Sequence, residues 1–284
     1  MILRYFIFFL SFSIYPFAFG QSKLFTKEEL LKAPRFIRIK DALKLPEKAW
    51  RLDLSYHELT EVSEDIEKIS ELQWLKLTRN RVRELPSGIG KCKNLQYLEM
   101  DFNDIQKVPN SICDLVNLKE VLLNNNQLIV LPECIKNWQN LQKLDLSYNF
   151  MEYLPDGIGE LKNLKYFNLK FSGIKKIPES IGNMESLEYL NLASNRFVDL
   201  PNSMGKLKKL KFLDLSYNLI KEFPNFILSL TQLEELHLKG TRIMKFPDLS
   251  TLKNLKILNV KGNSITKLEV AELQKQLPNT KIIY

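Results

Sequence analysis

Apolar residues recur along most of the chain in one fixed pattern. Leu141–Asn149 shows it in full, with apolar side chains at the first, fourth and sixth places and asparagine at the ninth. The step between successive copies is twenty-three residues, except for the last step of twenty-two. The ten copies begin at Ala49, Leu72, Leu95, Leu118, Leu141, Leu164, Leu187, Leu210, Leu233 and Leu255. So strict a period predicts a solenoid of stacked repeats.

Each copy of the pattern predicts a short β-strand. Leu144 and Leu146 alternate with polar residues, so both point into the core while Lys143 and Asp145 face the other way. Neighbouring strands then pair in parallel at a spacing of about 4.8 Å and form one face of the array. Proline in the following segment favours an extended return along the outer side, where its missing N–H costs nothing.

The ninth place predicts a tight turn after each strand. The buried amide of an asparagine can satisfy backbone groups that such a turn leaves unpaired. His57, Ser172 and Thr241 take the place in three repeats, and we expect His57 to substitute for asparagine structurally. The asparagines are Asn80, Asn103, Asn126, Asn149, Asn195, Asn218 and Asn263.

The second half of the repeats adds a more specific signature. An apolar residue followed by proline stands at one phase in eight repeats, as in Leu131-Pro132, and Ile-Gly often follows, as in Ile158-Gly159. This L-P-x-x-I-G-x-L pattern resembles the twenty-three-residue class of the leucine-rich repeat family, found in Ras-pathway scaffolds, plants and many bacterial proteins. The lead-in Asp41–Ser55 resembles the first turn of exported bacterial members. The resemblance implies an α/β solenoid, a curved horseshoe with a parallel β-sheet on its concave face.

The array leaves short segments at both ends of the chain. Residues 1–20 are predicted to be a signal peptide, 21–48 an N-terminal cap, 49–279 the ten repeats and 280–284 a terminal capping strand. Thr26 and Glu29 fit a capping box, so a short helix should run through Leu31 and stop before Pro34. Ile283 is predicted to fill a core place in the last strand. The last strand leaves an exposed edge on the sheet, and we expect this end of the array to fray rather than to form a weak dimer.

The first residues resemble a secretory signal peptide. An uncharged run follows Arg4, Pro16 breaks it, and Ala18-Phe19-Gly20 provides small residues for cleavage before Gln21. Because Gln21 is not cysteine, the signal is not that of a bacterial lipoprotein. The alternative is an uncleaved membrane anchor, since the uncharged span is just long enough to cross a bilayer. The chain is therefore expected to be exported, to the periplasm, the cell surface or the exterior.

Three cysteines leave at least one free thiol. Cys92, Cys113 and Cys134 fall in successive repeats but drift by two places each time, which argues against a metal site or a ladder of bridges in register. We expect them to act as small buried apolar side chains. Cys92–Cys113 is the one pair that we consider for a disulfide.

The sequence does not support catalysis. The two histidines, His57 and His237, lie eight strand steps apart, roughly 40 Å at the strand spacing, so they share no site. We expect the His237 side chain to be solvated. The chain has no H-E-x-x-H, phosphate-cradling glycine loop or G-x-S-x-G motif. We therefore expect a non-enzymatic protein without cofactor or metal.

The outward strand positions offer a binding surface. Aromatic side chains beside amides and carboxylates suit a protein or peptide ligand, and the alternative is a glycan of the cell envelope stacked on the same rings. Ladders of like residues also stabilise neighbouring strands, which gives the same residues a purely structural explanation. The candidate residues on the concave face are Trp74, Tyr97, Asp145, Tyr148, Tyr166, Asn168, Phe171, Tyr189, Asn191, Phe212, Asp214 and Tyr217.

The formal charge of +8 does not predict nucleic-acid binding. The expected concave wall carries eleven Lys or Arg and nine Asp or Glu, so the excess lies mainly on the outer turns and the ends. A nucleic-acid reader would concentrate positive charge along one groove. The prediction is a monomeric, non-enzymatic interaction module that docks a protein or peptide.

Overall fold

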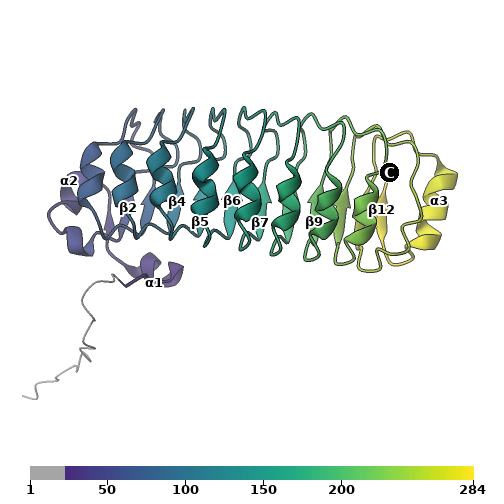
Figure 1. Cartoon of the computed structure of the whole chain (residues 1–284), viewed down its shortest axis with the longest axis horizontal. Coiled ribbons are helices and arrows are strands. Elements are labelled where there is room, and N and C mark those ends of the chain that lie inside the picture. The colour runs from purple at the N-terminus through teal and green to yellow at the C-terminus, as the bar shows by residue number, and fades with distance from the viewer. Residues whose placement is uncertain (1–22) are drawn as a thin grey trace, which may run out of the picture.

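The computed structural model describes residues 23–284, which form one elongated array (Figure 1). Its twelve strands between those residues make a single open sheet in which each strand pairs in parallel with the next one in sequence. The predicted α/β solenoid is confirmed. The predicted signal peptide lies outside the described residues. Within residues 23–284, none of the helices combines the length and the apolar composition that a bilayer span needs.

Most strands are three residues long. They are β1 (Arg35–Phe36), β2 (Arg51–Asp53), β3 (Trp74–Lys76), β4 (Tyr97–Glu99), β5 (Glu120–Leu122), β6 (Lys143–Asp145), β7 (Tyr166–Asn168), β8 (Tyr189–Asn191), β9 (Phe212–Asp214), β10 (Glu235–His237), β11 (Ile257–Asn259) and β12 (Lys281–Ile283). The middle residue of strands β2 to β11 is buried in the core, as the alternation predicts.

Short helices complete the array, and the 3-10 helices form a row on the side away from the strands (Figure 1). The α-helices are α1 (Lys27–Lys32), α2 (Ile39–Ala42) and α3 (Lys267–Gln276). The 3-10 helices are η1 (Pro46–Lys48), η2 (Glu64–Lys68), η3 (Ser87–Lys91), η4 (Asn110–Asp114), η5 (Glu133–Asn137), η6 (Asp156–Glu160), η7 (Glu179–Asn183), η8 (Asn202–Lys206) and η9 (Asn225–Ser229). Helices η3 to η9 each begin directly after a proline in extended conformation, which explains the recurrent proline.

The asparagines join each turn to the one before it, as predicted. Asn149 Nδ2 donates to the carbonyl oxygens of Leu146 at 2.8 Å and Leu123 at 3.0 Å, and its Oδ1 accepts from the backbone N–H of Leu128 at 2.9 Å. Ser172 replaces this with one inter-repeat bond, from its Oγ to the carbonyl oxygen of Leu146 at 2.9 Å. The same three-bond arrangement recurs at Asn80, Asn103, Asn126, Asn195 and Asn218.

The expected structural role of His57 is wrong. Its side chain is exposed, and its backbone N–H donates to Asn80 Oδ1 at 3.1 Å. The carbonyl oxygen of Leu54, three residues before His57, accepts from Asn80 Nδ2 at 2.8 Å. The asparagine of the second repeat organises the first turn instead.

Two different parts of the chain precede the first repeat. Strand β1 pairs with β2, and the β1–α2 region contributes Ala42 to the core, with Phe36, Ile39 and Leu43 packed against it. Helix α1 lies apart from α2 and from the 3-10 helices in Figure 1. It carries the predicted capping box between Thr26 and Glu29 and ends before Pro34, which confirms the predicted helix.

The C-terminal end contains a helix that the sequence analysis did not predict. Helix α3 has its own capping box, between Thr266 and Glu269, and buries Leu273. Strand β12 confirms the predicted final strand, but its expected register is wrong. Ile282 pairs with Leu258 and packs against the core, whereas Ile283 lies opposite Asn259 on the other face of the sheet. The step from Leu258 is therefore twenty-four residues, because α3 lengthens the last return.

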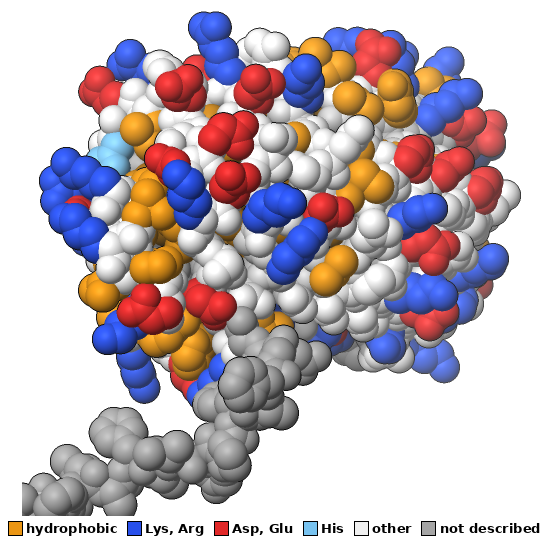
Figure 2. Space-filling model, turned by 60° about the vertical axis from the view of Figure 1, so that its left-hand side comes forward, with side chains coloured by type: hydrophobic (Ala, Val, Ile, Leu, Met, Phe, Trp, Pro, Cys, Tyr) orange, Lys and Arg blue, Asp and Glu red, His pale blue; other side chains and the backbone are white. Residues whose placement is uncertain are grey.

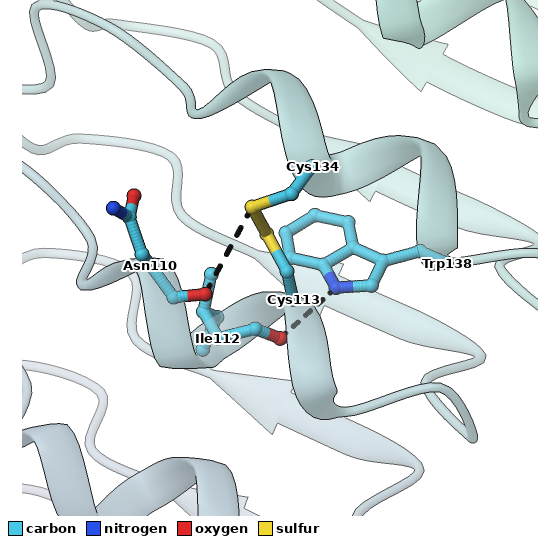
Figure 3. The surroundings of a disulfide bond; sticks show 5 residues. All are labelled: Asn110, Ile112, Cys113, Cys134 and Trp138. Atoms are coloured by element: carbon cyan, nitrogen blue, oxygen red, sulfur yellow. Dashed lines mark hydrogen bonds between the residues drawn. A yellow bond between two sulfur atoms is a disulfide. The ribbon is translucent and has the colours of Figure 1, made fainter.

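A disulfide joins Cys113 to Cys134, so the expectation of small buried apolar side chains is wrong for these two cysteines (Figure 3). The pair that we considered, Cys92–Cys113, does not form, and Cys92 is a buried free thiol. The two bridged cysteines lie on the stacked helices η4 and η5, with their Cα atoms 5.6 Å apart. Beside the bridge, the indole N–H of Trp138 donates to the carbonyl oxygen of Ile112 at 3.1 Å. Cys92 follows η3 at the place that buried Trp138 holds after η5, and burial raises the pKa of its thiol to about 12.

Candidate functional site

The expected concave surface is the side of the sheet that faces away from the core. We call it the sheet face and define it by the first and third residues of strands β2 to β11. Parallel register places the residues at one position directly beside each other, for example Tyr166 beside Tyr189 and Tyr189 beside Phe212. Similar residues at the same position of neighbouring repeats therefore form ladders of side chains on the sheet face.

Three aromatic rings form one continuous stack on the sheet face. Tyr166, Tyr189 and Phe212, which we call the aromatic ladder, come from the first positions of β7, β8 and β9. Adjacent ring centroids lie 4.3 Å apart at both steps, with interplanar angles of 10° and 8°. The Lys143 ammonium lies 5.2 Å from the Tyr166 centroid at one end, and the His237 ring lies 5.3 Å from Phe212 at the other.

Stacking leaves the ladder partly exposed through its ring edges. All three residues are half-buried, because each ring covers a face of its neighbour. Burial raises the pKa of Tyr166 well above its usual range, and the nearby Asp145 carboxylate and Tyr189 add to the rise. The Tyr166 hydroxyl is therefore protonated at neutral pH and can donate a hydrogen bond to a ligand.

His237 extends the ladder instead of projecting freely into solvent. Its side chain is only 20% exposed, and its Nε2 lies 3.1 Å from Glu235 Oε2 on the same strand. The expectation of a solvated side chain is wrong because the Phe212 ring covers one of its faces. His57 and His237 lie on different repeats, as the sequence requires.

The polar residues beside the ladder hold the strand ends. Their side-chain oxygens accept from the backbone N–H two residues later, with distances of 3.0 Å at Asp145 and 2.8 Å at Asp214. Asn168 and Asn191 do the same with Lys170 and Ala193 at 3.1 and 3.0 Å. These bonds fix the turn after each strand. The four residues therefore have a structural role that limits how freely they can bind a ligand.

A second set of aromatics lies where the strands end. Tyr148, Phe171 and Tyr217, which we call the edge aromatics, have exposed fractions of 42%, 56% and 51%. Tyr148 and Phe171 stack with centroids 5.5 Å apart. All three have φ values near +55°, in the left-handed region that costs a non-glycine residue roughly 1–2 kcal/mol. The later repeats place Gly240 and Gly262 there instead.

Trp74 and Tyr97 lie under the chain's own N-terminal residues. They occupy the first positions of β3 and β4, yet only 3% and 5% of their surfaces are exposed. Leu30 of α1 is fully buried against them, and the Lys27 ammonium lies 5.5 and 5.1 Å from their ring centroids. The sequence analysis placed residues 21–48 at the end of the core, so it missed this cover.

Charge does not single out one part of the surface. Figure 2 shows acidic and basic side chains interspersed over the side of the molecule that it presents, with apolar side chains gathered between them. An ion pair on the sheet face joins Lys76 to Glu99 at 3.0 Å, and another joins Lys211 to Glu188 at 2.7 Å directly before strands β9 and β8. On the side shown in Figure 2, the described residues form no continuous positive groove of the kind that a nucleic-acid reader presents.

The described residues provide no cluster of metal ligands, and their large open groove lies apart from the ladder. Within residues 23–284, no group of three or more His, Cys, Asp or Glu side chains is placed to hold a metal ion. An open groove of about 1260 Å³ lies between α2 and the first repeats, lined by apolar residues such as Leu54, Val62 and Leu85. His57 is the histidine on its wall, and no ladder residue reaches it.

Comparison with known proteins identifies the repeats. The chain matches the leucine-rich repeat region family over residues 51–152, 112–197 and 152–281. No curated protein matches the chain.

Several solved structures share the fold. An internalin, InlF of Listeria monocytogenes, is 18% identical with a TM-score of 0.68, and the match covers 88% of this chain and 77% of that one. A TDR receptor is 22% identical with a TM-score of 0.74, covering 89% and 45% of the two chains. The plant peptide hormone receptor RGFR1 in complex with RGF2 is 25% identical with a TM-score of 0.62, covering 82% and 47%. The chain thus spans less than half of either receptor.

Proposed function

The chain belongs to the leucine-rich repeat family, and we propose that it is a non-enzymatic interaction module whose aromatic ladder docks a protein or peptide. The observation that carries the proposal is the stack of Tyr166, Tyr189 and Phe212, held at 4.3 Å spacing on rigid strands. Aromatic side chains that are already ordered lose little entropy on binding and are enriched among the residues that dominate interface energies.

The surroundings of the ladder suit an amphipathic protein ligand. Ring edges carry partial positive charge and favour carbonyl oxygens or the faces of other rings. Lys143 at one end and Glu235 beside His237 at the other provide opposite charges that can orient a peptide. The exposed Tyr148 and Phe171 enlarge the apolar area at the border of the sheet face.

Structural neighbours support a peptide or protein as the class of ligand. One of them is a peptide hormone receptor in complex with RGF2, and another neighbour is a plant receptor kinase ectodomain in complex with Casparian strip integrity factor 2. The fold is thus able to hold such ligands. Which protein or peptide binds here depends on this chain's own surface.

A glycan receives less support from the same rings. Sugar binding through stacking needs an open aromatic face, whereas both faces of Tyr189 are covered by Tyr166 and Phe212. The edge aromatics are more exposed, but Phe171 and Tyr148 also stack on each other. We therefore propose the protein or peptide ligand ahead of the glycan.

We also propose that the protein is an exported bacterial member of the twenty-three-residue class and acts as a monomer. The Cys113–Cys134 disulfide supports export, because such bonds persist in oxidising compartments outside the cytosol. The short edge strand β12 supports a monomer, since it offers few backbone groups for pairing. Mass spectrometry of the mature N-terminus in separate cell fractions tests cleavage after Gly20.

The ladder can be tested by removing two of its rings. The double variant Tyr166→Ser, Tyr189→Ser is expected to lose capture of the envelope protein or peptide that the wild-type chain enriches, with an unchanged far-UV circular dichroism spectrum. Tyr153→Ser is the matched control, because Tyr153 is 58% exposed on the return segment away from the ladder.

Each outcome bears on the proposal. Undiminished capture by the double variant contradicts the ladder as the binding site. Loss of capture in both variants shows a nonspecific effect of tyrosine removal and also contradicts it. Binding of wild type to a glycan array, abolished in the double variant, assigns the site to a glycan instead.

A further inference from the structure

We propose that strands β2 to β5 form a second peptide-binding site, which recognises a lysine-bearing peptide and holds the chain's own residues 23–33 as its resident ligand. We call these residues the N-terminal segment and the surface beneath them the N-terminal site. The inference rests on the proposed function only in placing a peptide on the sheet face. Its residues are separate from the ladder, so the two proposals can fail independently.

The N-terminal segment does not close the hydrophobic core. That role belongs to the β1–α2 region, whose Ala42 is fully buried in the main core. Leu30, Trp74 and Tyr97 form a second cluster of buried residues, with Phe25 and Trp50 packed against it. The segment is thus an additional layer on the sheet face, where a ligand would lie.

Two buried glutamines hold the backbone of the segment. Gln73 Oε1 accepts from the N–H of Phe25 at 2.8 Å, and Gln73 Nε2 donates to the carbonyl oxygen of Lys23 at 2.8 Å. Gln96 Nε2 donates to the carbonyl oxygen of Phe25 at 3.0 Å. Both glutamines are fully buried, so their amides have given up water for these bonds. Such contacts recognise any peptide backbone, independent of its side chains.

The side-chain specificity centres on Lys27. Its ammonium lies near the rings of Trp74 and Tyr97 and forms an ion pair with Glu120 of β5. A cation between two aromatic rings and a carboxylate is attracted by both the ring quadrupoles and the negative charge. A neutral or acidic residue at this position would lose the attraction to the aromatic rings and the attraction to the carboxylate. The site therefore selects lysine.

Two apolar side chains fix the register of the segment. Phe25 meets Trp50 edge to face, with centroids 4.9 Å apart, and Leu30 is fully buried. Relative to Phe25, the lysine stands two residues later and the leucine five residues later. The N-terminal site thus fits a peptide of the form Phe-x-Lys-x-x-Leu whose helix starts at the lysine, as α1 does.

The resident segment is held mainly by the site and its tether. Helix α1 has only six residues, too few for a stable helix in water, so the site supplies its order. The tether is short, with Ala33 extended before Pro34 at φ −67° and ψ 155°. A tether of this kind gives a weak ligand a high effective concentration. A peptide in solution therefore binds well only when the segment is released.

The release can be engineered without touching the site. In the full-length chain, Phe25→Asp with Leu30→Asp places carboxylates at the two apolar anchors. Leu31→Asp is the matched control, because Leu31 belongs to the same helix but is 55% exposed. The probe is a fluorescein-labelled synthetic peptide of residues 23–33, and its anisotropy reports binding to each chain.

We expect the double variant to bind the probe at least roughly tenfold more tightly than wild type or the Leu31→Asp chain, whose sites stay occupied. A probe carrying Lys27→Glu should not bind any of the chains. The ladder variant Tyr166→Ser, Tyr189→Ser, added to the double variant, should leave probe binding unchanged, which separates this inference from the ladder.

Three results would overturn the inference. One is a folded double variant that does not bind the probe. The second is equal binding of the Lys27→Glu probe, which would remove lysine recognition. The third is cooperative loss of the array's circular dichroism in the double variant, because the segment would then be part of the fold itself.

Discussion

The two ends of the sheet face use the same position of the repeat in different ways. Trp74 and Tyr97 stand beside each other on β3 and β4, as Tyr166 and Tyr189 do on β7 and β8. The first pair is buried beneath Lys27 and Leu30, whereas the second pair stacks and keeps its edges partly exposed. Aromatic rings at this position are thus covered by a segment of the chain in one half and keep exposed edges in the other.

The comparison shows that a residue's position in the repeat does not decide whether its side chain is exposed on the sheet face. Every first strand position faces away from the core, but what lies over it depends on segments outside the repeats. The N-terminal half is also tied by charge, with Lys76 paired to Glu99 and Trp74 donating to the same carboxylate at 2.9 Å. The ladder is instead held by ring stacking, and the Tyr189 hydroxyl accepts from Asn191 Nδ2 at 3.4 Å.

The largest expected effect compares two fully buried leucines. Leu146→Asp places an unpaired carboxylate in the repeat core and should destabilise the array by more than about 4 kcal/mol. Leu30→Asp is equally buried in the wild type, yet it should only detach the N-terminal segment and lower the array's Tm by about 3 °C or less. Thermal unfolding followed by circular dichroism measures both.

Lys143→Ala is the control for an outward position in the same repeat as Leu146. It should change the stability of the array by less than about 0.5 kcal/mol. Equal losses in the Leu146→Asp and Leu30→Asp chains would mean that the segment and the repeats fold as one unit. The N-terminal segment would then be part of the repeat fold and not a separate layer on the sheet face.

An intermediate effect is expected at the border between the two halves. The Cys113–Cys134 bridge closes a loop with a sequence separation of 21 between the third and fourth repeats. Cys113→Ser should therefore cost about 3 kcal/mol of stability, mainly by freeing the unfolded chain. Urea unfolding of wild type with and without reductant measures the same loss independently, and reductant should not affect the variant. A wild type insensitive to reductant would contradict the bridge.

The smallest expected effect is a pH dependence confined to the covered half. The hydrogen bond from the Thr26 backbone N–H, together with Lys23, lowers the pKa of Glu29 below its ordinary value of 4.5. A lowered pKa stabilises the capped segment above that value, and the stabilisation is lost as pH falls through the lowered pKa. Trp50 and Trp74 beside the segment should report its loosening by fluorescence as the pH falls below 4.5.

Glu29→Gln separates this titration from others in the protein. Glutamine keeps the capping hydrogen bond but does not titrate. The variant should therefore show a flatter fluorescence change over the same pH range. An identical profile in both chains would assign the change to groups elsewhere.

Much of the fold was predictable because local sequence patterns decide which side chains each repeat buries. The alternation around Leu144 and Leu146 fixed which side chains are buried, and the capping box at Thr26 and Glu29 located α1. The box at Thr266 and Glu269 carried the same signal for α3 and was overlooked. The ladder residues Tyr166 and Tyr189 were also placed side by side by the period alone.

The cover of Trp74 and the pairing of Cys113 were not predictable in the same way. Lys27 reaches Glu120 across a sequence separation of 93, and no periodic pattern encodes such a contact. The bridge depends on how the neighbouring helices η4 and η5 stack, which brings places two residues out of phase within reach. Both features depend on packing between segments with different roles.

The sequence by itself determined the period, the parallel strands, the buried asparagines and the outward row of aromatics, because burial within a repeat follows from local alternation. Only the tertiary structure decided which part of that row is covered, which cysteines join and which residue of β12 enters the core. Those outcomes depend on free energies of contact between distant segments. A repeat pattern specifies what each turn buries against the next turn, and leaves open what lies across their shared face.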